Sequence, residues 1–312
     1  MQTRTEMIDE LYKTIGTDSG VLDDPEVAYL VVHQNKVLGS NSVPGLKMDV
    51  DELPDGISAV VKVEEGTVIE KPIHLCFGVL PETGIQKILL NVDIGRNSRI
   101  SLLAHCTFPN AVDVQHIMDA KIYVGAGADY SYFERHIHGE EGGVKVYPKA
   151  IVELEQGARF KTEFELLRGR VGLIDINYET TCKDYSVMEM IARVNGTGDD
   201  VIKINEVGHL VGEGARGALT SRIAVRDRAK AEVRNTLTAT APFARGHVDC
   251  KEIVQDEGIA TAIPVVDVRH PKAHVTHEAA IGSVDNKQLE TLMARGLTED
   301  EAVEVIIQGL LS

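Results

Sequence analysis

The stretch GAGAD at residues 125–129 marks a spacing that decides the fold. Small or turn-forming residues precede a new apolar run there, and the same arrangement recurs around Ser98 and Ala158, at equal distances before and after Ala128. Further along, the spacing falls to about half of this distance, at Ala215, Ala229, Ala244, Ile259 and Lys272. A fixed period in a chain of short strands is typical of stacked rungs rather than of a sandwich.

The segments between these turns are short and β-branched, for example AVVKV at 59–63, ILLNV at 88–92 and KIYV at 121–124. Such runs favour strands. A rung of about 29 residues, made of two half-turns, buries its apolar side chains against the rungs above and below. The sequence therefore predicts a mainly β protein with a parallel β-helix core over residues 85–283.

The two ends differ from this repeat. Residues 3–15 have helical periodicity and, with the turn-rich segment that follows, predict a mixed α/β cap over residues 1–84. Near the other end, Asp285 can cap a helix that Gly296 ends, and the TEDE stretch at 298–301 is a capping box that opens a second helix. We expect residues 284–312 to form a helical hairpin that either caps the last rung or docks a partner.

The composition and charge of the chain argue against several classes of function. The formal charge of −16 argues against a nucleic-acid partner, which requires clustered Lys and Arg. The first residues are charged and amphipathic, unlike a signal peptide, and apolar runs are too short to span a bilayer. We expect a cytoplasmic protein without a membrane anchor. Because no Walker motif occurs, we expect any ATP to be hydrolysed by a partner protein. We expect the chain itself not to be an enzyme.

Four widely separated cysteines are expected to be reduced, and mostly buried, thiols: Cys76, Cys106, Cys182 and Cys250. Cys250 precedes His277 and Glu278 by slightly less than one predicted rung. All three side chains are therefore expected on adjacent rungs, on one side of the stack. A thiolate, an imidazole and a carboxylate suit iron or zinc in an open site. The alternative is a core cysteine and a hydrogen-bonded surface histidine.

Another possible ligand set lies in the stretch ERHIH at 134–138. Strand alternation places Glu134, His136 and His138 on one face, which could hold a divalent metal ion. The preferred interpretation of this stretch is a solvated strand face.

An ordered series of motifs in the last quarter of the chain resembles the SufB/SufD family of iron–sulfur cluster assembly proteins. The matching elements are Cys250, the AIP stretch at 262–264, the HEA stretch at 277–279, Gln288-Leu289, the MARGL stretch at 293–297 and Glu301-Ala302. Weaker similarity extends back through KPIHL at 71–75 and GAR at 157–159. The resemblance implies a right-handed parallel β-helix, a dimer built on that core, and a SufC-type ABC ATPase docked on the C-terminal helices.

The resemblance also implies roles for individual residues. Cys250 is similar to the SufB cysteine that receives sulfur and ligates the nascent cluster. His277 matches the position of a SufD histidine, and Glu278 matches a SufB glutamate, so both are expected to bind iron. The assembly site is expected between two subunits, in a homodimer or a heterodimer with a paralogue, supplied by a sulfur donor protein. The expected cofactor is a transient iron–sulfur cluster.

The chain departs from the SufB pattern where Glu155 replaces an interior cysteine on the sulfur route. Cys182 could substitute for it, although a buried thiol is the preferred interpretation. The leading hypothesis is a SufB-like scaffold. One alternative is a SufD-like partner that anchors the ATPase without binding a cluster. Another is a β-helix enzyme such as a lyase or acyltransferase, which the 4% aromatic content disfavours.

Overall fold

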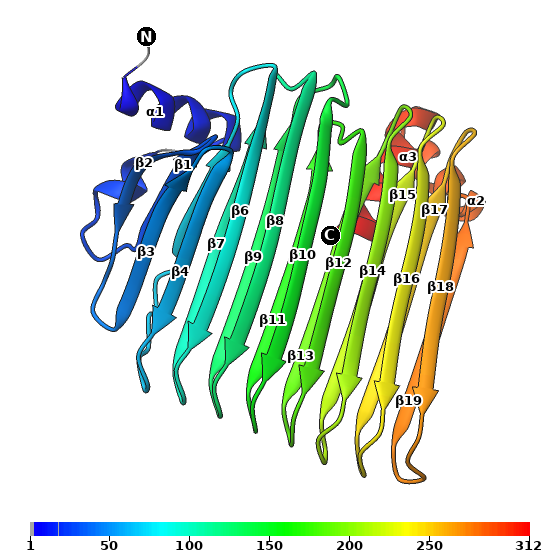
Figure 1. The fold of residues 1–312 in the computed structure, drawn as a ribbon. Helices are drawn as coiled ribbons and strands as arrows, with labels where there is room; N and C mark the ends of the chain where they lie inside the picture. Colours follow the sequence, from blue (N-terminus) through cyan, green and yellow to red (C-terminus); the bar gives the residue numbers. More distant parts are fainter. Residues whose placement is uncertain (1–2, 18) are drawn as a thin grey trace.

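The structure is a computed structural model that describes residues 3–17 and 19–312. Its core is a parallel β-solenoid in which successive strands alternate between two sheets (Figure 1). The first sheet has ten strands, in the spatial order β19 (His274–Gly282), β17 (Arg245–Val254), β15 (Arg216–Val225), β13 (Val187–Gly196), β11 (Arg159–Arg168), β9 (Asp129–His138), β7 (Arg99–Phe108), β5 (Ile73–Gly78), β1 (Tyr29–His33) and β2 (Lys36–Asn41). The second has nine, in the order β18 (Ile259–Val268), β16 (Lys230–Ala239), β14 (Val201–Leu210), β12 (Leu173–Cys182), β10 (Val144–Leu154), β8 (Asp113–Val124), β6 (Thr83–Ile94), β4 (Gly56–Val63) and β3 (Leu46–Leu53).

The register of the stack confirms the predicted period. Arg99 pairs with Asp129 and Asp129 pairs with Arg159, so each rung advances the chain by the distance that separates Ser98 from Ala128. Later rungs are shorter by one or two residues, because Arg159 pairs with Val187 and Arg216 pairs with Arg245. Parallel pairing already includes β4 and β5, which lie N-terminal to residue 85.

The corners between strands explain why the sequence has this spacing. Gly127 and Gly157 adopt φ angles of +66° and +68°, a left-handed conformation that glycine adopts at little cost. A small residue follows at each such corner and packs inside, with 0–1% of its surface exposed: Ser98, Ala128, Ala158, Ala215, Ala229 and Ala244. The last two predicted corner positions were wrong by a single residue. Register places Gly258 beside Ala229 and Ala273 beside Ala244, next to the predicted Ile259 and Lys272.

Alternation along each strand forms the core. In β8, for example, Val114, Met118 and Ala120 are buried, while the outward residues of the strand are partly or fully exposed. One continuous apolar cluster runs through the solenoid from Ala28 to Cys250. Inward side chains of successive rungs therefore stack directly on one another, about 4.8 Å apart.

Both terminal helical regions pack on the outer face of the ten-stranded sheet. Helix α1 (Arg4–Ile15) begins with a capping box at Thr3 and buries Leu11 and Tyr12, and the short 3-10 helix η1 (Ser19–Asp23) follows. At the other end of the stack are α2 (Asn286–Met293) and α3 (Glu299–Leu311), and α3 buries Ile307 and Leu311 against Ala224. The hairpin thus covers a side of the last rungs and does not close their end.

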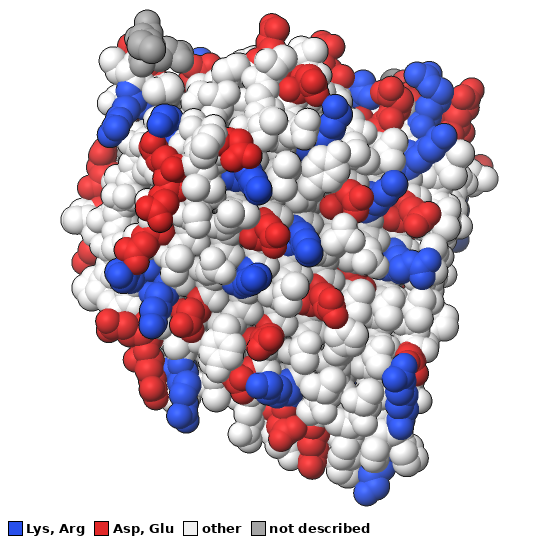
Figure 2. All heavy atoms as spheres, in the orientation of Figure 1, with Lys and Arg blue, Asp and Glu red and all other residues white. Residues whose placement is uncertain are grey.

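Among the described helices, none is long and apolar enough to cross a membrane. On the face shown in Figure 2, lysine and arginine side chains are interspersed with aspartate and glutamate. Stacked pairs such as Lys145–Asp113, at 3.0 Å, link neighbouring strands of one sheet. Exposed pairs of this kind add little stability.

Candidate functional site

Cys250 lies near the C-terminal end of the stack, one strand below the edge of the ten-stranded sheet. Its side chain is completely buried on the inner face of β17, between Ser221 on β15 and Ala279 on β19 in the register of the sheet. The amide of Asn235 on β16 lies 3.6 Å from Sγ. Burial raises the pKa of the Cys250 thiol, so the thiol form dominates at neutral pH in the isolated chain.

Two buried carboxyl groups lie near this thiol, and the sequence-based reasoning missed both. Burial raises the pKa of Glu206 to about 8 and that of Glu252 to about 7. The amide of Asn235 satisfies both its hydrogens by donating to Glu206 Oε2 at 3.3 Å and to the Arg234 carbonyl at 3.2 Å. Both oxygens of Glu252 are buried without a hydrogen-bond partner among the described residues. In the sequence, each of these glutamates stands at a position of its strand where the alternation predicts an inward, apolar side chain, and this feature could have identified both.

The structure brings Cys250 and His277 to the same face of adjacent strands. His277 pairs with Val248, which is buried inside, so alternation directs His277 to the inner side that also holds Cys250. Glu278 instead pairs with Asp249 on the outer side, where its Oε1 lies 3.7 Å from Lys251 Nζ. Within one chain, Glu278 therefore points away from the thiol. The expectation that all three side chains share one side of the stack does not hold for Glu278, because neighbouring residues of a strand alternate.

The end of the stack next to Cys250 is open. Strands β18 and β19 are the edges of their sheets, and most of their residues are half-buried or exposed. Apolar side chains on these strands stay accessible, with Ile281 46% and Val268 45% exposed. His277 lies in this open rung. Unpaired strand edges and exposed apolar side chains together are typical of a surface that another chain covers.

The predicted solvated face at Glu134, His136 and His138 is wrong. All three side chains point into the solenoid, with 1%, 1% and 6% of their surfaces exposed. The alternation was read correctly, but its inward face was taken for the outward one, because glutamate and histidine seldom lie in a core. Glu134 and His136 gather there with Cys106 and His116. All four cysteines are buried, as the sequence predicts for most of them.

We expect Glu206→Gln to stabilise the protein at alkaline pH. The pKa of Glu206 is about 8 when folded and 4.5 ordinarily, so this carboxyl binds its proton more tightly in the folded state. Its contribution is complete below the unfolded pKa and is lost as pH rises toward the folded pKa. Thermal unfolding should show the variant more stable than wild type by a few kcal/mol near pH 8 and nearly equal to it near pH 4.

The exposed Glu257→Gln variant is the matched control and should show neither effect. A wild-type stability that is flat across this pH range would contradict the assigned ionisation of Glu206.

Comparisons with known proteins agree on one family. The sequence matches the family model described as SUF system FeS cluster assembly, SufBD core domain, over residues 82–310. An iron–sulfur cluster assembly SufBD family protein of Methanocaldococcus jannaschii is 39% identical over 282 residues, covering 90% of this chain and 89% of the relative. Another from Pyrococcus horikoshii is 37% identical over 306 residues, covering 98% and 93%. One from Archaeoglobus fulgidus is 28% identical over 251 residues, covering 79% and 66%.

Proposed function

The chain belongs to the SufBD family of iron–sulfur cluster assembly proteins, and on that premise we propose that it acts as a SufB-like scaffold. One observation carries this proposal: an inward-facing thiol, Cys250, lies one strand below an inward-facing imidazole, His277, at the open end of the solenoid. A soft thiolate and an imidazole are both ligands of iron, and a scaffold needs a site that is open enough to load and release its product.

The buried carboxyls supply a route for the thiol proton. In the isolated chain Cys250 is protonated, whereas sulfur transfer and iron binding both need the thiolate. With a pKa of about 7 and no hydrogen-bond partner in the described structure, Glu252 is suited to accept that proton. The Cys250 thiolate then attacks the terminal sulfur of a donor persulfide, forming a new S–S bond as the donor leaves as a thiolate. Iron is bound as a substrate of assembly.

The remaining ligands come from a second subunit in this proposal. The open rung leaves His277 exposed, and Glu278 points outward in its own chain. A copy of the chain, or a paralogue, that covers β18 and β19 can bring its own imidazole and carboxylate to the thiol. This accounts for a site that provides too few ligands within one chain.

The C-terminal hairpin is proposed to dock a SufC-type ATPase. A groove at α2 and α3 has an apolar part formed by Ile253, Leu292, Val305, Ile306 and Leu310, and polar residues of α2 such as Lys287 and Gln288 complete its lining. Of the Val305 surface, 45% is exposed. The Arg226–Glu304 ion pair, at 2.5 Å, joins α3 to the corner after β15. In this proposal, a movement of the hairpin caused by the ATPase is transmitted through this contact to β15, the strand next to the one that carries Cys250. Copurification of the ATPase with the wild type tests this surface, and undiminished binding to Val305→Glu would contradict it.

Anaerobic incubation with ferrous iron and sulfide tests the scaffold function. A scaffold is expected to acquire visible sulfur-to-iron charge-transfer absorption together with bound iron and acid-labile sulfide. Failure of both the wild-type chain and its complex with the ATPase to take up a cluster would identify a SufD-like anchoring partner instead.

A further inference from the structure

A second group of metal-binding side chains lies inside the solenoid, on β7, β8 and β9, far in sequence from Cys250. One ligand atom from each of Cys106, His116, Glu134 and His136 lies within 4.8 Å of the others. All four side chains have 1% or less of their surface exposed. The rings of Phe108 and Phe164 pack on the imidazoles, with centroids 5.0 Å from His116 and 4.8 Å from His136. Aromatic rings therefore enclose this polar group.

The hydrogen bonds of His136 and His138 determine which ring nitrogen of His136 carries no proton and can bind a metal ion. His138 Nδ1 lies 3.2 Å from the Arg170 carbonyl, which can only accept, so the His138 proton is on Nδ1. A neutral imidazole carries a single proton, so His138 Nε2 has no proton of its own. His138 Nε2 must then accept from His136 Nδ1 at 3.1 Å. This leaves a bare lone pair on His136 Nε2, only 2.7 Å from Glu134 Oε1.

The hydrogen bonds of His116 likewise leave one of its ring nitrogens without a proton. Gln86 Nε2 donates to two backbone carbonyls, those of Gln34 at 3.1 Å and Gly78 at 3.2 Å. Its Oε1 therefore faces His116 Nδ1, at 3.1 Å, and accepts the His116 proton. His116 Nε2 is a bare lone pair with no partner among the described residues, and Glu134 Oε2 has none either.

We propose that Cys106, His116, Glu134 and His136 form a four-coordinate site for a divalent transition-metal ion such as Zn²⁺. Thiolate, imidazole and carboxylate are all ligands of zinc, and four of them complete a closed structural site. Ligands about 2.0–2.3 Å from a tetrahedral ion lie roughly 3.3–3.8 Å apart, which small side-chain rotations achieve here. The thiolate and the carboxylate neutralise the ion, so the core gains no net charge.

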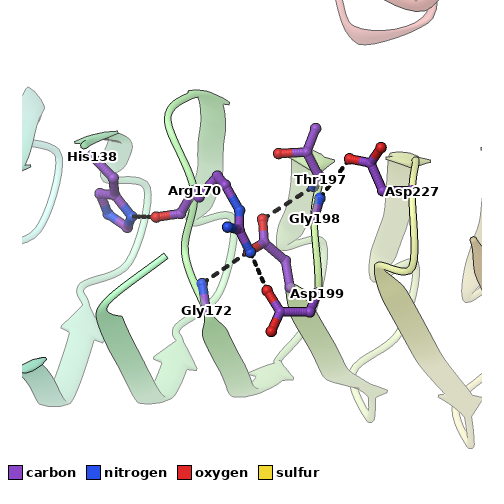
Figure 3. A network of polar contacts seen from close by, with 8 residues as sticks. His138, Arg170, Gly172, Thr197, Gly198, Asp199 and Asp227 are labelled. Carbon is purple, nitrogen blue, oxygen red and sulfur yellow. Dashed lines mark hydrogen bonds and ion pairs between the residues drawn. The ribbon is translucent and has the colours of Figure 1, made fainter. Parts of the chain in front are cut away.

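The surroundings of this site resemble an outer shell of a metal centre. Metal-binding histidines commonly donate the N–H of their second nitrogen to a carboxylate, a backbone carbonyl or water, and the side-chain carbonyl of glutamine is an acceptor of the same kind. His116 does so to Gln86, and His136 does so through His138 to Arg170. Figure 3 shows that the corner holding this carbonyl is fixed in turn, because the Arg170 guanidinium pairs with Asp199 and with Asp200, the latter at 3.1 Å.

The ion would connect neighbouring rungs and both sheets. Cys106 and His136 are register partners on β7 and β9, and His116 reaches them from β8 across the interior. A metal ion bound here therefore adds a link across the interior, between β8 and the hydrogen-bonded pair of strands β7 and β9. Because all ligands are buried, loading is expected during folding, and exchange from the folded protein is expected to be slow.

Refolding with Co²⁺ or Zn²⁺ after removal of metal by a chelator tests the site. Cys250→Ser serves as the parent, so that an iron–sulfur site cannot contribute. This parent is expected to bind a single Co²⁺ per chain, with tetrahedral visible bands and a thiolate-to-cobalt charge-transfer band. Adding Cys106→Ser should remove the charge-transfer band, and adding His116→Gln with His136→Gln should remove Co²⁺ binding altogether. Cys182→Ser is the matched control and should change neither.

X-ray absorption at the zinc edge of the Zn²⁺-loaded parent does not depend on whether variants fold. One sulfur and three nitrogen or oxygen neighbours are expected. A parent that binds neither ion, a Co²⁺ spectrum unchanged by Cys106→Ser, or six oxygen neighbours around zinc would each overturn the proposal.

Discussion

Replacing Cys250 by serine is expected to abolish the charge-transfer absorption that the wild type gains on anaerobic incubation with iron and sulfide. A serine hydroxyl neither accepts sulfane sulfur nor remains bound to iron as a thiolate does. Bound iron and labile sulfide should fall by more than roughly tenfold, since loss of even an outer-shell partner commonly has that effect. Iron and sulfide analysis after desalting, together with the visible spectrum, measures the loss.

Cys182→Ser is the matched control for this loss. Cys182 is also fully buried, and burial raises its thiol pKa to about 12, but it lies on β12, away from the open end of the stack. The control should retain the cluster, and both variants should unfold at similar temperatures. A Cys250→Ser protein that still assembles a full cluster would remove Cys250 from the mechanism.

The fold was predictable because small residues recur at the corners with the period of the rungs. A left-handed residue followed by a buried Ala or Ser is found where the chain turns between sheets, so the pattern repeats along the chain. At the open end of the stack, the positions of the corners were harder to identify from the sequence. There the corner residue before Ile259 is a glycine, and β18 and β19 have few covered side chains to mark their inward face.

The candidate site was predictable only in part. Spacing placed Cys250 and His277 on adjacent strands, but a spacing close to the period cannot show which face a side chain occupies. Glu278 thus lies on the opposite face from the thiol. Glu206 was missed, and His136 and His138 were assigned to the solvent face, because burial depends on contacts between residues one full rung apart. The sequence pattern shows that side chains alternate between two faces of a strand, but it does not show which of these faces is buried in the core.

Substitutions at the open end of the solenoid are expected to have a large effect on self-association. We expect Val268→Lys with Ile281→Lys to convert the proposed dimer into a monomer. The register places both side chains on the inner face of the last rung, where each is nearly half exposed and no further rung of the described chain covers it. A second copy or a paralogue that covers them buries apolar area, whereas two lysines on each subunit would be desolvated there. The dimer dissociation constant should rise by about 100-fold or more, as loss of roughly 3 kcal/mol implies.

Sedimentation equilibrium of both proteins measures this change. The control is Val112→Lys with Ile151→Lys, which places the same charges at apolar residues 57% and 43% exposed, away from the open end. It should leave association unchanged. The proposed shared site takes ligands from the second subunit, so the monomeric variant should also lose cluster uptake while its unfolding temperature stays close to that of the control. If it stays dimeric, the subunits meet elsewhere; if it becomes monomeric and still assembles a cluster, the shared site is wrong although the interface is right.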